Sequence, residues 1–105
     1  MSVHNITDTD ITTLLSENEK VMVKYYADWC GSCKLIAPKY RRLSEDERFN
    51  GIEFLEVNAE VNENARRVAG VDNLPFFAVF KNGEFIEGTA TSKVEKVEEL
   101  LNKLN

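Results

Sequence analysis

The pattern of hydrophobic and polar positions predicts strands and helices in alternation from the start of the chain. A weak strand at 3–6 precedes a short helix with capping candidates at 7–10. The apolar face of that helix is formed by Ile11, Leu14 and Leu15. Residues 21–27 read VMVKYYA and are apolar on both alternations except at Lys24. This pattern predicts a central strand that is covered on both faces.

The middle of the chain continues the alternation. Apolar residues recur at helical spacing from Cys33 onward, at Ile36, Tyr40 and Leu43. Pro38 lies inside this predicted helix and should kink it. Another strand is predicted at 52–57 (IEFLEV), and a short helix that ends at Gly70 should follow it. The apolar positions of that short helix are Val61, Ala65, Val68 and Ala69.

The last third of the chain predicts a hairpin and a closing helix. Strands at 76–80 (FFAVF) and 84–88 (EFIEG) flank Lys-Asn-Gly-Glu at 81–84, and Asn-Gly between strands is a strong hairpin signal. The closing helix carries apolar positions Val94, Val97, Leu100, Leu101 and Leu104. The resulting order, β-α-β-α-β-α-β-β-α, predicts an α/β fold in which helices flank a central mixed sheet. The length of 105 residues predicts a single domain, 1–105.

Composition and charge narrow the class of protein. The chain has 13 basic and 18 acidic residues and a net charge of −5, which disfavours a nucleic-acid partner. No apolar run approaches the roughly 20 residues that a membrane helix needs. The first ten residues, MSVHNITDTD, lack the apolar stretch of a secretory signal. We therefore expect a cytoplasmic protein, and in that compartment a cysteine pair is more often catalytic or metal-binding than structural.

Cys30 and Cys33 are the two cysteines of the chain and stand three positions apart in the segment ADWCGSCKLIAPKY. A structural zinc site wants four ligands, and the chain offers only His4 besides this pair. A copper(I) carrier also uses two thiolates at this spacing, so that reading stays open. A purely structural disulfide across so short a loop would add little stability.

Thiol–disulfide exchange fits the pair best. Cys30 follows a predicted strand and stands where a helix begins, and unpaired N–H groups at a helix start favour an anion. They should lower the pKa of a thiol placed there. Lys34 adds a positive charge nearby, although it is equally well explained as a solvated surface residue. Cys33 lies one helical turn further on and suits a second, less exposed thiol that resolves a mixed disulfide.

The hexapeptide at 29–34 resembles the signature of the thioredoxin family. Here it reads Trp29-Cys30-Gly31-Ser32-Cys33-Lys34. The likeness extends to Pro38, which matches the family's helix-kinking proline, and to Leu74-Pro75, where the family places a cis-proline facing the disulfide. The hairpin turn, the element order and the length agree as well. The resemblance therefore covers essentially the whole chain.

The resemblance implies a protein-disulfide reductase with no bound cofactor and no metal. It implies Cys30 as the nucleophile and Cys33 as the resolving thiol. Clients would dock beside Trp29 and on the backbone at Leu74-Pro75. Electrons would come from an NADPH-dependent flavoprotein reductase, and the partners would be disulfide-containing proteins met by a monomer. A disulfide oxidase or isomerase of the same fold remains the alternative within this chemistry.

Several positions depart from the family pattern. Ser32 replaces the proline between the cysteines, and Phe76 stands where threonine commonly follows the cis-proline. Tyr26 replaces a frequent tryptophan, and Thr91 falls near a glycine that lets the client backbone approach. These departures bear on substrate preference rather than on the type of reaction.

Lys24 is the largest departure. The resemblance places a buried aspartate at this position and a lysine on the neighbouring strand, where this chain has Glu56. We expect a reversed ion pair in which Glu56 can accept the proton of Cys33, since Asp28 should be exposed at the strand end. The alternative is that Lys24 extends to solvent and Glu56 is an ordinary strand carboxylate.

Overall fold

The computed structural model describes residues 3–105. Its elements follow the predicted order, β-α-β-α-β-α-β-β-α. They are β1 (Val3–Ile6), α1 (Asp8–Glu17), β2 (Lys20–Tyr26), α2 (Gly31–Ser44), β3 (Ile52–Asn58), α3 (Glu63–Ala69), β4 (Phe76–Lys81), β5 (Glu84–Ala90) and α4 (Val94–Asn102). One 3₁₀ turn, Glu47–Phe49, joins α2 to β3.

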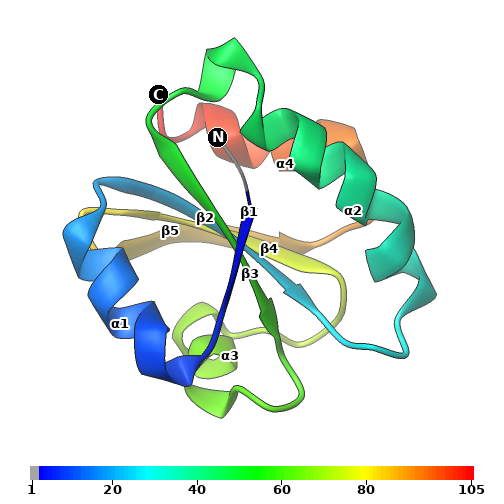
Figure 1. Ribbon diagram of the computed structural model, residues 1–105. Helices are drawn as coiled ribbons and strands as arrows, with labels where there is room; N and C mark the ends of the chain where they lie inside the picture. The colour runs from blue at the N-terminus through cyan, green and yellow to red at the C-terminus, as the bar shows by residue number, and fades with distance from the viewer. Residues whose placement is uncertain (1–2) are drawn as a thin grey trace.

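The five strands form one mixed sheet in the order β1-β3-β2-β4-β5. The strands β1, β3 and β2 run parallel, and β4 and β5 are antiparallel to their neighbours. Helices α1 and α3 cover one face of the sheet and α2 and α4 cover the other (Figure 1). The predicted fold class is confirmed.

Strand β2 is the centre of the sheet and separates two hydrophobic cores. Val21, Val23 and Tyr25 belong to the core beneath α1 and α3, whereas Met22 belongs to the core beneath α2 and α4. Side chains alternate between the faces of a strand, so Lys24 points to the same side as Met22, toward α2. The one polar residue inside the predicted central strand therefore lies on the face that carries the cysteines.

The hairpin between β4 and β5 confirms the Asn-Gly signal. Asn82 has φ 53° and Gly83 has φ 84°, the left-handed conformation that a type I′ turn needs at both central residues. None of the helices within residues 3–105 is long and apolar enough to span a membrane.

The helix predicted around 61–69 is shorter than the pattern suggested. It begins at Glu63, and Val61 lies outside it with 76% of its surface exposed. Val68 is inside the helix but is 46% exposed, so Ala65 and Ala69 alone are buried. Two small inward side chains suffice because α3 packs closely against α1, and Gly70 ends the helix at φ 63° as predicted.

Candidate active site

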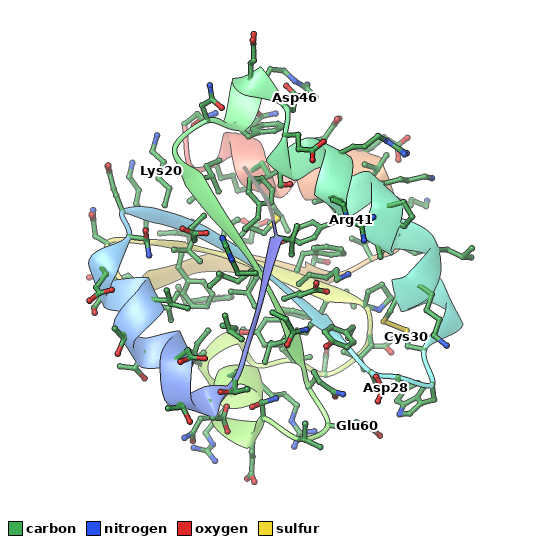
Figure 2. All side chains as sticks on the ribbon, in the orientation of Figure 1. Lys20, Asp28, Cys30, Arg41, Asp46 and Glu60 are labelled. Carbon is green, nitrogen blue, oxygen red and sulfur yellow. A yellow bond between two sulfur atoms is a disulfide. The ribbon has the colours of Figure 1, made fainter. Side chains whose placement is uncertain are left out.

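Cys30 and Cys33 are joined as a disulfide at the start of α2, where β2 leaves the sheet (Figure 2). Cys30 is the N-cap residue of α2, and its Sγ accepts a hydrogen bond from the backbone N–H of Cys33 at 3.1 Å. The two residues are 5% and 3% exposed. Cys33 is the less exposed of the two, as predicted, although the difference is small.

The start of α2 favours a negative charge on Cys30. A helix N-terminus leaves backbone N–H groups without intrahelical acceptors and carries the positive end of the helix dipole. The bond from the Cys33 N–H is one such interaction, and it would be stronger to a thiolate than to a neutral sulfur. Lys34 is exposed, so its charge acts through solvent.

The disulfide is open to approach along the chain between the cysteines. Gly31 and Ser32 are both exposed, and an added Cβ at Gly31 would meet no atom within 4 Å. Leu74 packs against the cluster formed by Ala27, Cys30 and Cys33. The Leu74-Pro75 peptide bond is cis, as the resemblance implied. Thr91 lies beside this loop, since its backbone N–H donates to the carbonyl of Pro75 at 3.0 Å.

Trp29 stands beside the disulfide with 68% of its surface exposed. Its indole N–H donates to Oε2 of Glu60 at 2.6 Å. An open pocket of about 290 Å³ separates Trp29 from Leu74 and is also lined by Asp72 and Arg66. Asp28, Cys30 and Glu60 lie at the same end of the molecule (Figure 2). Sequence reasoning missed Glu60, although its place just after β3 was a usable signal, because the carboxyl ends of parallel strands meet at one sheet edge.

The aromatic departures from the family pattern occupy different environments. Phe76 is buried and packs edge-on against Tyr25, with ring centroids 6.0 Å apart. Tyr26 is half-buried, and its hydroxyl accepts a hydrogen bond from Asn5 at 2.6 Å. Phe76 therefore belongs to the core beneath α1 and α3, whereas Tyr26 lines the cysteine side of the sheet.

Lys24 and Glu56 form the predicted ion pair. They are register partners on β2 and β3, and Lys24 Nζ lies 3.4 Å from Oε2 of Glu56. The lysine side chain is 4% exposed and that of Glu56 27%, so the alternative in which Lys24 extends to solvent was wrong. Burial lowers the pKa of the Lys24 ammonium, and the attraction of Glu56 partly offsets that effect.

The ion pair and Cys33 line the same open pocket, which has a volume of about 170 Å³. Tyr26, Ala37 and Asp28 complete much of its wall. Asp28 is exposed, as expected for the strand end. The pocket is large enough for water, so a proton can pass between Cys33 and Glu56 without direct contact.

No cluster of three or more His, Cys, Asp or Glu side chains within residues 3–105 could hold a metal ion. His4 lies on β1 with its Nε2 3.6 Å from a carboxylate oxygen of Glu53. The site thus consists of a disulfide-bonded cysteine pair, a helix N-terminus, an apolar rim and a buried ion pair.

Comparison with known proteins gives one consistent family. The thioredoxin family model matches residues 2–105. Thioredoxin-T of Drosophila melanogaster is 35% identical over 96% of this chain and 64% of its own length. Thioredoxin-2 of Pyricularia oryzae is 30% identical over 97% of this chain and 59% of its own length. The chain thus spans less than two thirds of each of these relatives.

A solved structure extends the likeness to the whole chain. The reduced thioredoxin pre-protein of Schistosoma mansoni is 31% identical, with a TM-score of 0.88 over 100% of both chains. Similarity in sequence and in backbone therefore point to the same family.

Proposed function

Because this chain belongs to the thioredoxin family, we propose that it is a thiol–disulfide oxidoreductase that reduces disulfides in client proteins. The observation that carries the proposal is the Cys30–Cys33 disulfide at the N-terminus of α2, with Cys30 Sγ accepting the Cys33 N–H. That arrangement supplies a stabilised thiolate and a second thiol within reach of it.

The reaction has two exchange steps. The Cys30 thiolate attacks one sulfur of the client disulfide, and the other client sulfur leaves as a thiolate. Cys33 then loses its proton and attacks Cys30 Sγ, which breaks the mixed disulfide and releases the second client thiolate. Both client thiolates take protons from solvent. Two electrons pass from the dithiol to the client, and the Cys30–Cys33 disulfide remains.

The position of Cys30 at the start of a helix favours the second exchange step as much as the first. A thiol with a pKa of about 8.5 is roughly 3% ionised at pH 7, and one with a pKa of about 7 is half ionised, a gain of about 15-fold. The same shift lowers intrinsic reactivity about fivefold, so attack gains only about threefold. A more acidic Cys30 is also a better leaving group when Cys33 attacks it.

Glu56 accepts the proton of Cys33 in this proposal, directly or through water in their shared pocket. Lys24 is the ion-pair partner of Glu56. Trp29 and Leu74 form the apolar rim on which clients dock, and the Leu74-Pro75 backbone meets an extended client segment. The exposed first turn of α2, at Gly31 and Ser32, leaves room for that segment, and Lys34 adds positive charge at its edge.

We also propose the oligomeric state, the location and the electron donor of the protein. The protein works as a monomer in the cytoplasm, has no bound cofactor, and receives electrons from an NADPH-dependent flavoprotein of the thioredoxin-reductase type. Its macromolecular partners are that reductase and the disulfide-containing clients.

Mixed-disulfide trapping tests the assignment of the two thiols. The Cys33→Ser variant should accumulate covalent complexes with clients through Cys30, because the resolving thiol is gone. The Cys30→Ser variant is the matched control and should trap almost none. Non-reducing electrophoresis followed by mass spectrometry measures both. Equal trapping by the two variants would refute the division of roles.

Two measurements separate the alternatives. The equilibrium potential against glutathione distinguishes a reductase from an oxidase or isomerase, because a reductase has the more negative value. Titration of the reduced protein with copper(I) tests the carrier reading, which requires tight stoichiometric binding by Cys30 and Cys33.

A further inference from the structure

We propose that the Lys24 ammonium stabilises the thiolate of Cys33, so that a buried cation makes the resolving thiol more acidic. The inference deepens the proposed function and rests on it for the role of Cys33. Its test reads the ionisation of Cys33 by itself, so a failure of the inference can be told apart from a failure of the trapping experiment.

The placement of Lys24 is the first argument. Its side chain leaves β2 on the face covered by α2, and Cys33 sits in the first turn of that helix. The residues share one pocket of about 170 Å³. Of the two cysteines, Cys33 is the one that lines this pocket. The resolving thiol is therefore the one that shares a pocket with the cation.

The surroundings of Lys24 keep it charged. Its Nζ lies 5.6 Å from the ring centroid of Tyr26 and 5.5 Å from that of Tyr40, and aromatic faces attract an ammonium group at such distances. Glu56 adds an ion pair at 3.4 Å. These three contacts oppose the cost of burial, so the lysine stays a cation rather than a neutral amine.

The sign of the electrostatic potential at Cys33 depends on how strongly solvent screens each charge near it. Lys24 is 4% exposed and Glu56 27%, and solvent screens the more exposed charge more strongly. The other charged groups facing the lysine or the pocket are Arg41 and Lys34 on α2 and Asp28 beyond β2.

These remaining charges are exposed, and the residue of β4 opposite Lys24 is the uncharged Phe77. The least screened charge in the pocket is therefore positive. A positive potential favours the thiolate and lowers the pKa of Cys33.

Removal of the Lys24 charge should change how the exchange rate of Cys33 depends on pH. We expect Lys24→Met to raise the pKa of Cys33 by about one unit. Below both midpoints the thiolate fraction then falls about tenfold while its intrinsic reactivity rises about threefold, so exchange slows about threefold. Above both midpoints, at a pH where Lys24 is still charged in the parent, the same variant exchanges about threefold faster. A variant that is merely less well folded would not produce profiles that cross.

The experiment uses a Cys30→Ser background, so that a single thiol titrates. The rate of exchange with hydroxyethyl disulfide is measured against pH, and ultraviolet thiolate absorbance gives the midpoint independently. This probe is uncharged, so attraction of the reagent to Lys24 cannot imitate the effect. Lys39→Met is the matched control, because it removes the same charge from an exposed position on α2.

The expected result is a raised midpoint and crossing profiles in Lys24→Met, and an unchanged midpoint in Lys24→Arg and in Lys39→Met. An unchanged midpoint in Lys24→Met, or an equal rise in Lys24→Arg, would overturn the proposal. If Lys24→Met does not fold, Lys24→Met with Glu56→Met replaces the whole pair by apolar side chains and is measured instead. Its midpoint should still rise, since the lysine is the less screened charge; a fall would overturn the proposal.

Discussion

The ring of Phe76 on β4 fills the space next to Gly88 on β5. A Cβ added to Gly88 would lie 2.7 Å from Cε1 and 2.9 Å from Cζ of Phe76, and 3.2 Å from the carbonyl oxygen of Phe77. The ring cannot easily turn away, because it is buried and packs against Tyr25. We expect Gly88→Ala to lower the free energy of unfolding by about 1–3 kcal/mol, as overpacking does. Urea unfolding measures it.

A double-mutant cycle identifies the cause of that loss. Phe76→Val removes the ring atoms, so Gly88→Ala should cost about 1 kcal/mol less in that background. Gly31→Ala is the control, because a methyl group there meets no atom within 4 Å. Additive effects at Phe76 and Gly88 would mean that the clash is relieved elsewhere.

Glu56 carries a prediction about the rate of resolution. Glu56→Gln keeps the size of the side chain but removes the proton acceptor in the Cys33 pocket. We expect release of the client from the mixed disulfide to slow at least about tenfold near neutral pH, with the attack by Cys30 much less affected. Rapid-quench kinetics with a client disulfide resolve the two steps.

The control for Glu56 lies on the same strand. Glu53 is 26% exposed, close to the 27% of Glu56, and its carboxylate faces His4 instead of the cysteines. Glu53→Gln should leave both steps unchanged. Glu56→Gln also removes a negative charge from the pocket, so it should not raise the pKa of Cys33. A slower resolution step then reports proton transfer, and an unchanged one would exclude Glu56 as the acceptor.

At the scale of elements, Asp8 joins α1 to α3. It is the first residue of α1, yet its carboxylate accepts hydrogen bonds from the backbone N–H groups of Ala65 at 2.8 Å and Asn64 at 3.1 Å. Its own N–H donates to Asn62 Oδ1 at 2.8 Å. The N-cap side chain of α3 makes no capping bond to its own helix. Asp8 therefore supplies the cap of a helix far along the chain.

Replacement of Asp8 should weaken α3 specifically. Asp8→Ala leaves two N–H groups at a helix N-terminus unpaired and should cost about 1–2 kcal/mol. Hydrogen exchange of the α3 amides should rise more than that of the α2 amides. Asp10→Ala is the control, since Asp10 is exposed in the same first turn of α1 and its carboxylate accepts a hydrogen bond from Thr7, at the start of its own helix. Equal losses from both changes would exclude a special role for Asp8.

Local patterns predicted the elements better than the contacts between them. Strand β2, the Asn82-Gly83 turn and the end of α3 at Gly70 follow from alternation and from backbone conformation, which short segments determine. The start of α3 was misplaced because Val61 is apolar yet exposed, and because the cap comes from Asp8. Capping from a distant residue leaves no trace in the local sequence.

In the candidate site, too, local features were predicted better than contacts between elements. Cys30 and Cys33 were predicted from spacing and from their place after a strand, and the pairing of Lys24 with Glu56 followed from the family pattern. The contact between Trp29 and Glu60 was not predicted, because it depends on how the ends of β2 and β3 meet.

At the scale of the whole molecule, each of the two cores contains a buried tyrosine. Tyr25 lies in the core beneath α1 and α3, and its hydroxyl has no hydrogen-bond partner among the described residues. Tyr40 lies in the core beneath α2 and α4, and its hydroxyl donates to the carbonyls of Leu55 at 2.8 Å and Met22 at 3.2 Å. Burial raises the pKa of both phenols. The sheet thus holds a group that resists ionisation on each face.

This arrangement predicts a loss of stability in alkali. An unfolded tyrosine ionises near pH 10, whereas the folded protein keeps both protons at that pH. The folded state then binds more protons than the unfolded state, so the free energy of unfolding falls as pH rises above about 10, by up to about 1.4 kcal/mol per pH unit for each tyrosine. Lys24 acts in the opposite direction, because burial lowers its pKa and folding becomes less costly once it is neutral. Two tyrosines against one lysine give a net decline.

Tyr25→Phe separates the two tyrosines. The change removes a phenol that cannot ionise in the fold, so stability should decline less steeply above pH 10, by up to about 1.4 kcal/mol per pH unit. At neutral pH the same variant should be about 1 kcal/mol more stable, because an unpaired hydroxyl no longer has to be buried. Tyr40→Phe should flatten the alkaline decline as well but lower stability at neutral pH, since it leaves two carbonyls without their donor. Urea unfolding at a series of pH values measures all three proteins. An alkaline decline as steep in Tyr25→Phe as in the parent would show that this phenol already ionises in the folded state.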